Sequence, residues 1–151
     1  MSGPFEGLIR YEGYEDVLLE KKNGVVVLTL NVPDKLNALT PGIRFSLKRV
    51  CEEVHHDDSA KVLVITGAGR GFCSGADVGG GPRAAPPPSR VRTMENSFAW
   101  ITRFQTIDKP VIAAINGVAA GGGLSLALGC DIRIASDQAR FLTVFVRRAL
   151  I

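Results

Sequence analysis

Three consecutive glycines, Gly121 to Gly123, separate two apolar runs of the chain. The run before them is VIAAI at 111–115, and the run after them is LSLAL at 124–128. Glycine costs about 0.5–1 kcal/mol relative to alanine inside regular structure, so three in a row indicate that another group approaches the backbone closely. The pattern predicts a buried strand, a tight turn and a helix that begins at the glycines.

The composition is that of one globular domain. The chain has 151 residues, of which 46% are hydrophobic and 22% charged, and a domain of that size buries about 68–70% of its unfolded surface. Its 18 lysines and arginines are dispersed among 15 acidic residues, for a net charge of +3. Because no basic stripe carries stacking aromatic side chains, we expect no nucleic-acid partner.

The cysteines and the N-terminus bear on the cellular compartment. Cys51, Cys73 and Cys130 are odd in number and lack Cys-x-x-Cys spacing, which argues against a disulfide framework and against a zinc site. The first residues show no basic segment followed by an apolar core, so no secretory signal is visible. We expect a cytoplasmic protein without a metal site.

A membrane alternative arises because residues 111–130 carry no charge over a membrane-spanning length. Glycines, a serine and the Asn116-Gly117 turn signal interrupt this segment. Two buried elements separated by a turn explain it better than one transmembrane helix, and we expect no membrane association.

The first part of the chain predicts a hairpin followed by a helix. Residues 17–30 contain two strand-like runs around Asn23-Gly24, the dipeptide that best supplies two positive φ angles in a tight turn. Thr40 and Pro41 have the residue types of a helix N-cap and first helical position. The helix should bury one face, formed by Ile43, Leu47, Val50 and Val54.

The rest of the chain predicts alternating strands and helices. Residues 61–67 form an apolar run of the kind buried on both faces of a sheet. A Gly/Pro-rich loop follows at 79–90, then an amphipathic helix from about 90 to 107 that Lys109-Pro110 ends. With further strands at 111–115 and 131–136, the order indicates an α/β fold.

Two glycine-bearing segments follow buried strands, GAGRGFCSGAD after Thr66 and GVAAGGGLSLA after Asn116. The first does not fit a dinucleotide fingerprint because Phe72 stands where the third glycine is needed, and the second lacks the Lys-Ser/Thr of a phosphate loop. Both offer unpaired backbone N–H groups, which suit an oxygen that becomes negative during a reaction. We therefore predict an oxyanion hole with one donor from each segment.

Three segments, NVPDKLNAL, GAGRGFCSGADV and KPVIAAINGVAAGGGLSLALGCDIRIAS, closely resemble the enoyl-CoA hydratase/isomerase (crotonase) family in order and spacing. The resemblance implies a fold of stacked ββα turns in a ClpP/crotonase-type spiral. It implies acyl-CoA thioester substrates of fatty acid or related acyl-CoA metabolism, with coenzyme A as part of the substrate and no other cofactor. It also implies a homotrimer or a hexamer.

The same resemblance implies domain limits and site residues. Residues 1–16 would be an N-terminal extension and 17–151 the first part of the domain, incomplete at its apolar C-terminal end. The backbone N–H groups of Ser74 and Gly122 would hold the thioester oxygen. The residues that receive the rest of the substrate would be Lys35, Leu36, Ala38, Gly75, Ala76, Asp77 and Gly121. In the alternative, Leu36 and Ala38 lead into the helix and Asp77 caps a turn.

The chain departs from the hydratase pattern at both glutamates that activate water in the family. The matching positions are Ser125 and, in a gap-free alignment, Phe145. A serine without a partner is no general base near neutral pH, and phenylalanine transfers no proton. Hydratase or isomerase activity and a noncatalytic acyl-CoA binding module therefore both stay open.

Other reactive side chains have simpler interpretations. Cys73 lacks an identifiable base and fits a small buried residue. His55 and His56 are adjacent in sequence, so they face apart on a helix and make poor joint metal ligands. Asp131 fits a role in satisfying local backbone groups.

Overall fold

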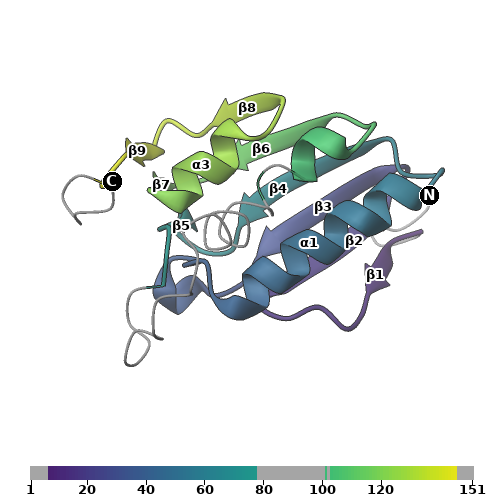
Figure 1. The fold of residues 1–151 in the computed structure, drawn as a ribbon, viewed down its shortest axis with the longest axis horizontal. Coiled ribbons are helices and arrows are strands. Elements are labelled where there is room, and N and C mark those ends of the chain that lie inside the picture. Colours follow the sequence, from purple (N-terminus) through teal and green to yellow (C-terminus); the bar gives the residue numbers. More distant parts are fainter. Residues whose placement is uncertain (1–6, 78–100, 102, 146–151) are drawn as a thin grey trace, which may run out of the picture.

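The computed structural model describes residues 7–77, 101 and 103–145. Two sheets organise them, one with strand order β1-β2-β3-β4-β6-β8 and one with order β5-β7-β9 (Figure 1). The elements are β1 Ile9–Tyr11, β2 Val17–Lys22, β3 Val25–Leu30, η1 Pro33–Lys35, α1 Pro41–His56, β4 Val62–Gly67, β5 Gly71–Cys73, η2 Arg103–Thr106, β6 Val111–Ile115, β7 Val118–Ala120, α3 Gly122–Leu128, β8 Ile132–Ala135 and β9 Arg140–Leu142. The predicted α/β architecture is confirmed.

The predicted hairpin is confirmed. Strands β2 and β3 pair antiparallel from Val17 opposite Leu30 to Lys22 opposite Val25. Asn23 and Gly24 connect them with φ angles of 52° and 81°, the two positive values that a type I′ turn requires. Strand β1, which lies in the segment expected to be an N-terminal extension, pairs antiparallel with β2.

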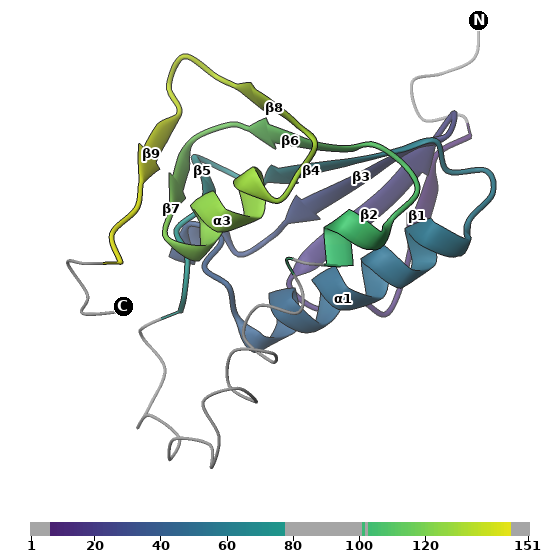
Figure 2. The same cartoon turned by 45° about the horizontal axis from the view of Figure 1, so that its top comes forward.

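Beyond the hairpin the large sheet is parallel, with β3, β4, β6 and β8 paired in that order. Parallel neighbours need crossover connections, and α1 supplies the one between β3 and β4. Figure 2 shows α1 and η2 on the same side of this sheet, while α3 lies beside the small sheet.

Helix α1 begins where the sequence predicts. The Thr40 side chain accepts a hydrogen bond from Ile43 N at 3.0 Å, and Pro41 occupies the first turn, where its missing N–H has no cost. The predicted inward face is buried, with exposed fractions of 2% or less for Ile43, Leu47, Val50 and Val54. These side chains join those of the strands in one hydrophobic core.

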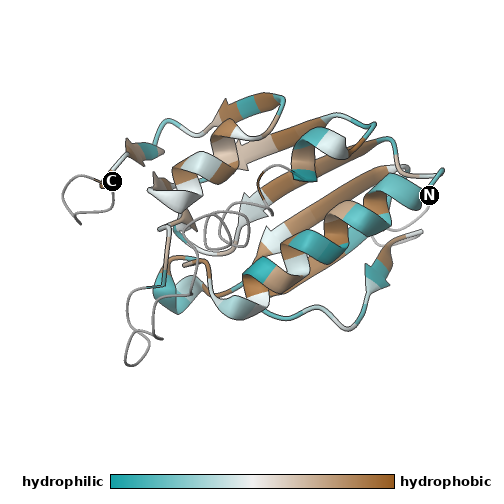
Figure 3. Ribbon diagram, viewed as in Figure 1, coloured by the Kyte–Doolittle hydropathy of each residue, from teal (hydrophilic) through white to brown (hydrophobic). Residues whose placement is uncertain are grey.

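The prediction that strand 61–67 is buried on both faces is wrong for the described part of the chain. Burial in β4 alternates, with Leu63 and Ile65 buried but Val62 and Val64 only half-buried. Figure 3 shows apolar residues along β3, β4 and β6, whereas α1 combines apolar and polar positions. Figure 2 shows α1 on one side of this sheet. The sequence of β4 is apolar on both faces, but within the described residues only one face is fully buried.

Two further predictions lie largely outside the described residues. These are the Gly/Pro-rich loop at 79–90 and most of the helix at 90–107; the final turn of the latter, η2, is a 3-10 helix. Residues 111–130 form β6, β7 and α3. In the part of the chain that the structure describes, no helix has both the length and the apolar character to cross a membrane.

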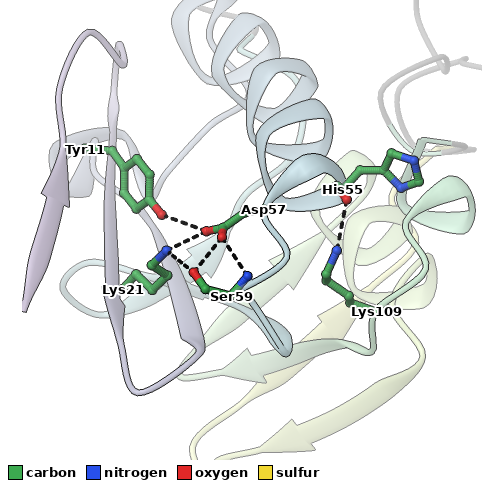
Figure 4. Close-up of polar contacts among 6 residues, drawn as sticks. All are labelled: Tyr11, Lys21, His55, Asp57, Ser59 and Lys109. Atoms are coloured by element: carbon green, nitrogen blue, oxygen red, sulfur yellow. Dashed lines mark hydrogen bonds and ion pairs between the residues drawn. The ribbon is translucent and has the colours of Figure 1, made fainter.

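A polar cluster joins the hairpin to the C-terminal end of α1 (Figure 4). Asp57 accepts hydrogen bonds from Lys21 Nζ at 2.6 Å and from Ser59 Oγ at 2.6 Å, and Tyr11 Oη lies at 3.3 Å. The bonds from Lys21 and Ser59 hold the pKa of the Asp57 carboxyl well below its usual range. Nearby, Lys109 Nζ donates to His55 O at 2.9 Å and ties the start of β6 to the same helix end.

Replacing Asp57 by asparagine should lower the free energy of unfolding at neutral pH by about 1 kcal/mol, because these charged hydrogen bonds are partly exposed. A depressed pKa contributes stability that is present above the unfolded value of about 3.9 and is lost as pH falls through the folded value. The difference between wild type and Asp57→Asn should therefore shrink below about pH 4. Urea unfolding from pH 2 to 7 tests this. Asp58→Asn is the control, and a difference independent of pH would contradict the expectation.

Candidate functional site

The three glycines lie where the end of β7 meets the end of β5, and two of them have distinct steric reasons to be glycine. Gly121 has a φ of 51°, which side chains other than glycine rarely adopt. A side-chain carbon on Gly123 would collide with the carbonyl oxygen of Cys73. The predicted close approach to the glycine backbone is therefore observed at Gly123, where the approaching group is the carbonyl of Cys73.

The middle glycine, Gly122, lies close to the loop after β5. A side-chain carbon there would lie 3.9 Å from Gly75 Cα, 4.0 Å from Ala76 N and 2.8 Å from the Leu39 side chain. Gly75 has a φ of 94°, and a carbon on it would lie 2.6 Å from Ala120 O and 3.2 Å from Gly122 N. The two glycine-bearing segments thus meet at Gly75–Ala76 and Gly122.

The N–H groups at this meeting point differ in what they bind. Ser74 N donates to Leu36 O at 2.9 Å, and Gly121 N donates to Leu142 O at 2.9 Å. Among the described residues, neither Ala76 N nor Gly122 N has a backbone acceptor. The expectation that Ser74 supplies an oxyanion donor conflicts with its bond to Leu36. Of the two N–H groups beside Gly122 in this loop, that of Gly75 interacts with the Cys73 thiol, and that of Ala76 has no backbone acceptor among the described residues.

The segment expected to receive coenzyme A lies along the same loop. Leu39 N donates to Gly75 O at 2.7 Å, which forms a single parallel bridge between Leu39 and Ala76. Lys35 Nζ pairs with Asp77 Oδ2 at 2.9 Å, and the Lys35 side chain is 54% exposed. The structure thus brings Gly75 and Ala76 beside Gly122, and it pairs Lys35 with Asp77, the next residue of the same loop.

Leu36 and Ala38 occupy this segment in different ways. Leu36 ends η1 with a φ of 50° and is half-buried, and its side chain packs against Gly71. Ala38 is 6% exposed and precedes α1. Both backbone groups of Ala38 are engaged within the protein, since its N–H donates to Lys35 O at 3.2 Å and its carbonyl accepts from Thr40 N at 2.7 Å.

The two positions that match the hydratase glutamates both adjoin Gly121. Ser125 Oγ donates to Gly121 O at 3.3 Å, a bond within the first turn of α3. Phe145 Cε1 and Val144 Cγ2 would lie 3.9 and 3.2 Å from a side-chain carbon on Gly121. These side chains provide a hydroxyl and an apolar surface, but no carboxylate.

Two asparagines that the sequence analysis did not single out hold the turn between β4 and β5. Asn37 is fully buried; its Nδ2 donates to Ala68 O at 2.9 Å and Gly71 O at 2.8 Å, and its Oδ1 accepts from Val32 N. Asn116 Nδ2 donates to Gly67 O and Gly69 O, both at 2.9 Å. The sequence indicated only that Asn116 starts a turn, and it gave no sign that the Asn37 side chain binds backbone groups of the turn between β4 and β5.

The other reactive side chains have the simple roles that the sequence indicated. Cys73 is fully buried, and burial raises the pKa of its thiol to about 11, which disfavours the nucleophilic thiolate. Asp131 Oδ2 accepts a hydrogen bond from Val111 N at 2.8 Å. His55 Nδ1 lies 3.6 Å from Asp108, and within the described residues no three potential ligands cluster around a metal position.

A surface hollow of about 660 Å³ lies elsewhere, between the hairpin and α1. Its lining includes Lys21, Arg49, Glu53 and Asp57 but no residue around Gly122. Lys21 and Asp57 pair with each other, and Glu53 accepts a hydrogen bond from Tyr14. We assign no binding role to this hollow because these charges are satisfied within the protein.

Comparison with protein families identifies one match along most of the chain. The family model described as enoyl-CoA hydratase/isomerase matches residues 20–150. The chain is 39% identical over 140 residues to 1,2-epoxyphenylacetyl-CoA isomerase of Escherichia coli K12, covering 91% of this chain and 53% of that protein. It is 41% identical over 128 residues to (E)-benzylidenesuccinyl-CoA hydratase of Thauera aromatica, covering 83% and 48%.

Solved structures agree with this match. A structure of a putative enoyl-CoA hydratase from Streptomyces coelicolor A3(2) superposes with a TM-score of 0.82 at 35% identity, covering 99% of this chain and 56% of that one. A probable enoyl-CoA hydratase/isomerase from Mycobacterium abscessus gives 0.78 at 39% identity, with coverages of 89% and 52%. The chain thus spans about half the length of the curated relatives and solved structures described here.

Replacing Asn37 by alanine should lower the free energy of unfolding by about 2–4 kcal/mol, because the buried carbonyl of Gly71, the part-buried carbonyl of Ala68 and the amide of Val32 all lose this partner. Asn31→Ala is the matched control, since Asn31 is exposed and its loss should change stability by about 0.5 kcal/mol or less. Chemical denaturation measures both. Equal, small losses would show that the Asn37 bonds do not hold the turn.

Proposed function

The chain belongs to the enoyl-CoA hydratase/isomerase family, and we propose that it binds acyl-CoA thioesters and polarises their carbonyl group. The observation that supports this most directly is the proximity of Ala76, in the loop after β5, to Gly122, at the start of α3. Among the described residues, neither of their N–H groups has a backbone acceptor. A carbonyl oxygen between them would accept both hydrogen bonds.

The end of the Leu39 side chain lies beside Gly122, 2.8 Å from the place that a side-chain carbon would take, so a larger residue at 122 would have to displace it. The surroundings of the Gly122 donor are therefore partly apolar, and hydrogen bonds in such surroundings are electrostatically stronger than in water. The site suits a small polar group, the thioester carbonyl, attached to an apolar acyl chain.

In the proposed mechanism the two N–H groups stabilise negative charge that develops on the thioester oxygen. Removing the proton next to the carbonyl, or adding a nucleophile at the conjugated carbon, turns the thioester into an enolate. The donors are fixed before the reaction, so they need no reorganisation as the charge appears. Loss of one such donor costs about 3–4 kcal/mol of transition-state stabilisation in comparable sites.

We propose that coenzyme A lies along the segment that contains Lys35, Leu36 and Ala38, opposite Gly75 and Asp77. Lys35 is the charged group suited to a phosphate, and its side chain is exposed while its ammonium pairs with Asp77. Backbone groups of the remaining residues, including Gly121, would border the pantetheine arm and the thioester. The compartment and assembly we propose are the cytoplasm and a homotrimer or hexamer.

Hydration through two glutamates has no support at the matching positions, because Ser125 donates to a carbonyl and Phe145 is apolar. A double-bond isomerisation needs one group that moves a proton, and in that reaction the group would come from outside the described residues. The second candidate function is noncatalytic binding of acyl-CoA, which is favoured because Ser125 and Phe145 provide no carboxylate for proton transfer. Assays of crotonyl-CoA hydration, 3-enoyl-CoA isomerisation and acyl-CoA binding, run in parallel, separate these functions.

Gly122→Val should weaken the binding of hexanoyl-CoA at least tenfold, because the branched side chain fills the space before the two donors. The hairpin and α1 should remain folded, since the first atom met is the flexible end of Leu39. Calorimetric titration and circular dichroism measure the two effects. The control is Gly129→Ala at the other end of α3, where φ is −74° and a side-chain carbon would first meet a methyl group of Ile101, at 3.0 Å. Equal affinities for wild type, variant and control would reject this site.

Ser125→Glu should increase crotonyl-CoA hydration relative to the wild-type chain, whose hydration we expect to be slow. A positioned acid or base contributes about 10²–10⁴-fold, and the wild-type chain has neither glutamate at the matching positions. A continuous absorbance assay of the enoyl group follows the reaction, with Ser125→Gln as the uncharged control. Fast hydration by the wild-type chain would mean that another residue supplies the proton transfer.

A further inference from the structure

Ser74 makes two hydrogen bonds to consecutive carbonyl groups of the facing segment. Its backbone N–H donates to Leu36 O at 2.9 Å, and its Oγ donates to Lys35 O at 3.0 Å. A single residue thus ties the loop after β5 to the segment between η1 and α1. The hydroxyl is engaged as a donor to a carbonyl, so it does not act as an acid or base.

The facing segment has an uncommon backbone that makes this double bond possible. Leu36 and Asn37 have φ angles of 50° and 54°, a left-handed conformation that costs residues with a side chain about 1 kcal/mol or more each. Two such residues in succession turn the chain sharply. The buried Asn37 amide holds this turn from one side, through Val32, Ala68 and Gly71, and Ser74 holds it from the other.

We propose that Ser74 is a positioning residue, whose two bonds fix the Gly75–Ala76 peptide so that Ala76 N–H faces the same point as Gly122 N–H. This inference rests on the proposed function, because it assigns Ser74 a role in that oxyanion site. Ser74 itself contacts no reacting atom. It acts through Ala76, two residues further along the loop.

The path from Ser74 to the donor is short and continuous. After Ser74, the next carbonyl, Gly75 O, accepts from Leu39 N at 2.7 Å, and Ala76 bridges to Leu39. The donor peptide is therefore held on both sides by the segment 35–39. The Gly75 φ of 94° lets the loop turn toward Gly122 immediately after the Ser74 bonds. Without the Oγ bond, the loop keeps its backbone contacts and the Lys35–Asp77 ion pair, whose lysine is exposed, and it can shift relative to Gly122.

A structural role alone would lower stability but would leave the polarisation of a bound thioester unchanged. A purely structural role and a positioning role can be separated with 4-hydroxycinnamoyl-CoA, whose absorption moves to longer wavelength when hydrogen bonds polarise its carbonyl. Three Ser74 variants differ in the side-chain donor: Ser74→Ala lacks it, Ser74→Cys keeps the volume with a weak donor, and Ser74→Thr keeps the hydroxyl. Ser46→Ala is the matched control, because Ser46 Oγ also donates to a backbone carbonyl, Glu15 O at 2.8 Å, away from the site.

We expect Ser74→Ala and Ser74→Cys to lose at least half of the wild-type wavelength shift when saturated with this thioester. Ser74→Thr should retain most of the shift, and Ser46→Ala should keep all of it even if its stability falls. A full shift in Ser74→Ala and Ser74→Cys would overturn the positioning role while leaving the proposed oxyanion site intact. No shift in the wild-type protein would instead reject the oxyanion site, and the positioning role with it.

Amide hydrogen exchange of the unliganded protein tests the mechanical part without any ligand. Exchange of Leu39 N–H, which binds Gly75 O, should accelerate at least tenfold in Ser74→Ala and Ser74→Cys but not in Ser74→Thr. Amides of β3 should exchange as in the wild type, which establishes that the variants are folded. Unchanged exchange at Leu39 in both variants would show that Ser74 does not fix the loop, and would overturn the inference.

Discussion

Backbone lies directly against backbone where the two sheets meet, and the positions that permit this contact are glycines. A side-chain carbon on Gly67, Gly117 or Gly123 would collide with the carbonyl oxygen of Gly71, Arg70 or Cys73, respectively. Such collisions involve main-chain atoms and cannot be relieved by a change of rotamer. The crossing of β4 into β5 and of β6 into β7 therefore depends on these glycines. The same crossing brings Gly75 beside Gly122.

Close backbone packing also buries carbonyl groups that must find donors, since an unpaired buried polar group costs about 1–3 kcal/mol. Asn37 and Asn116 supply these donors to the turn at 67–71 from opposite sides in sequence. Within the described residues, every buried side-chain nitrogen and oxygen has a hydrogen-bond partner. The two asparagine amides therefore satisfy carbonyl groups of the turn that the glycines allow to form, and the loop after this turn brings Gly75 and Ala76 close to Gly122.

Local features of the fold were predictable from the sequence because their causes are local. Asn23-Gly24 fits one turn type, and Thr40-Pro41 begins a helix whatever lies around it. The sequence did not indicate that the Ser74 N–H binds Leu36 O, because that partner is distant in sequence. Likewise, the continuous apolar run of β4 does not reveal that one of its faces is only half-buried. The roles of Asn37 and Asn116 also depend on contacts that no spacing encodes.

The central claim is that Ala76 N–H and Gly122 N–H jointly bind a thioester oxygen. Nuclear magnetic resonance of the 15N-labelled chain, titrated with hexanoyl-CoA and separately with coenzyme A alone, tests it most directly. The account predicts that the amide protons of Ala76 and Gly122 both move downfield with the thioester but not with coenzyme A, while that of Ser74 stays in place. A downfield shift at Ser74 in place of Ala76, or none at either Ala76 or Gly122 in the thioester complex, would contradict it.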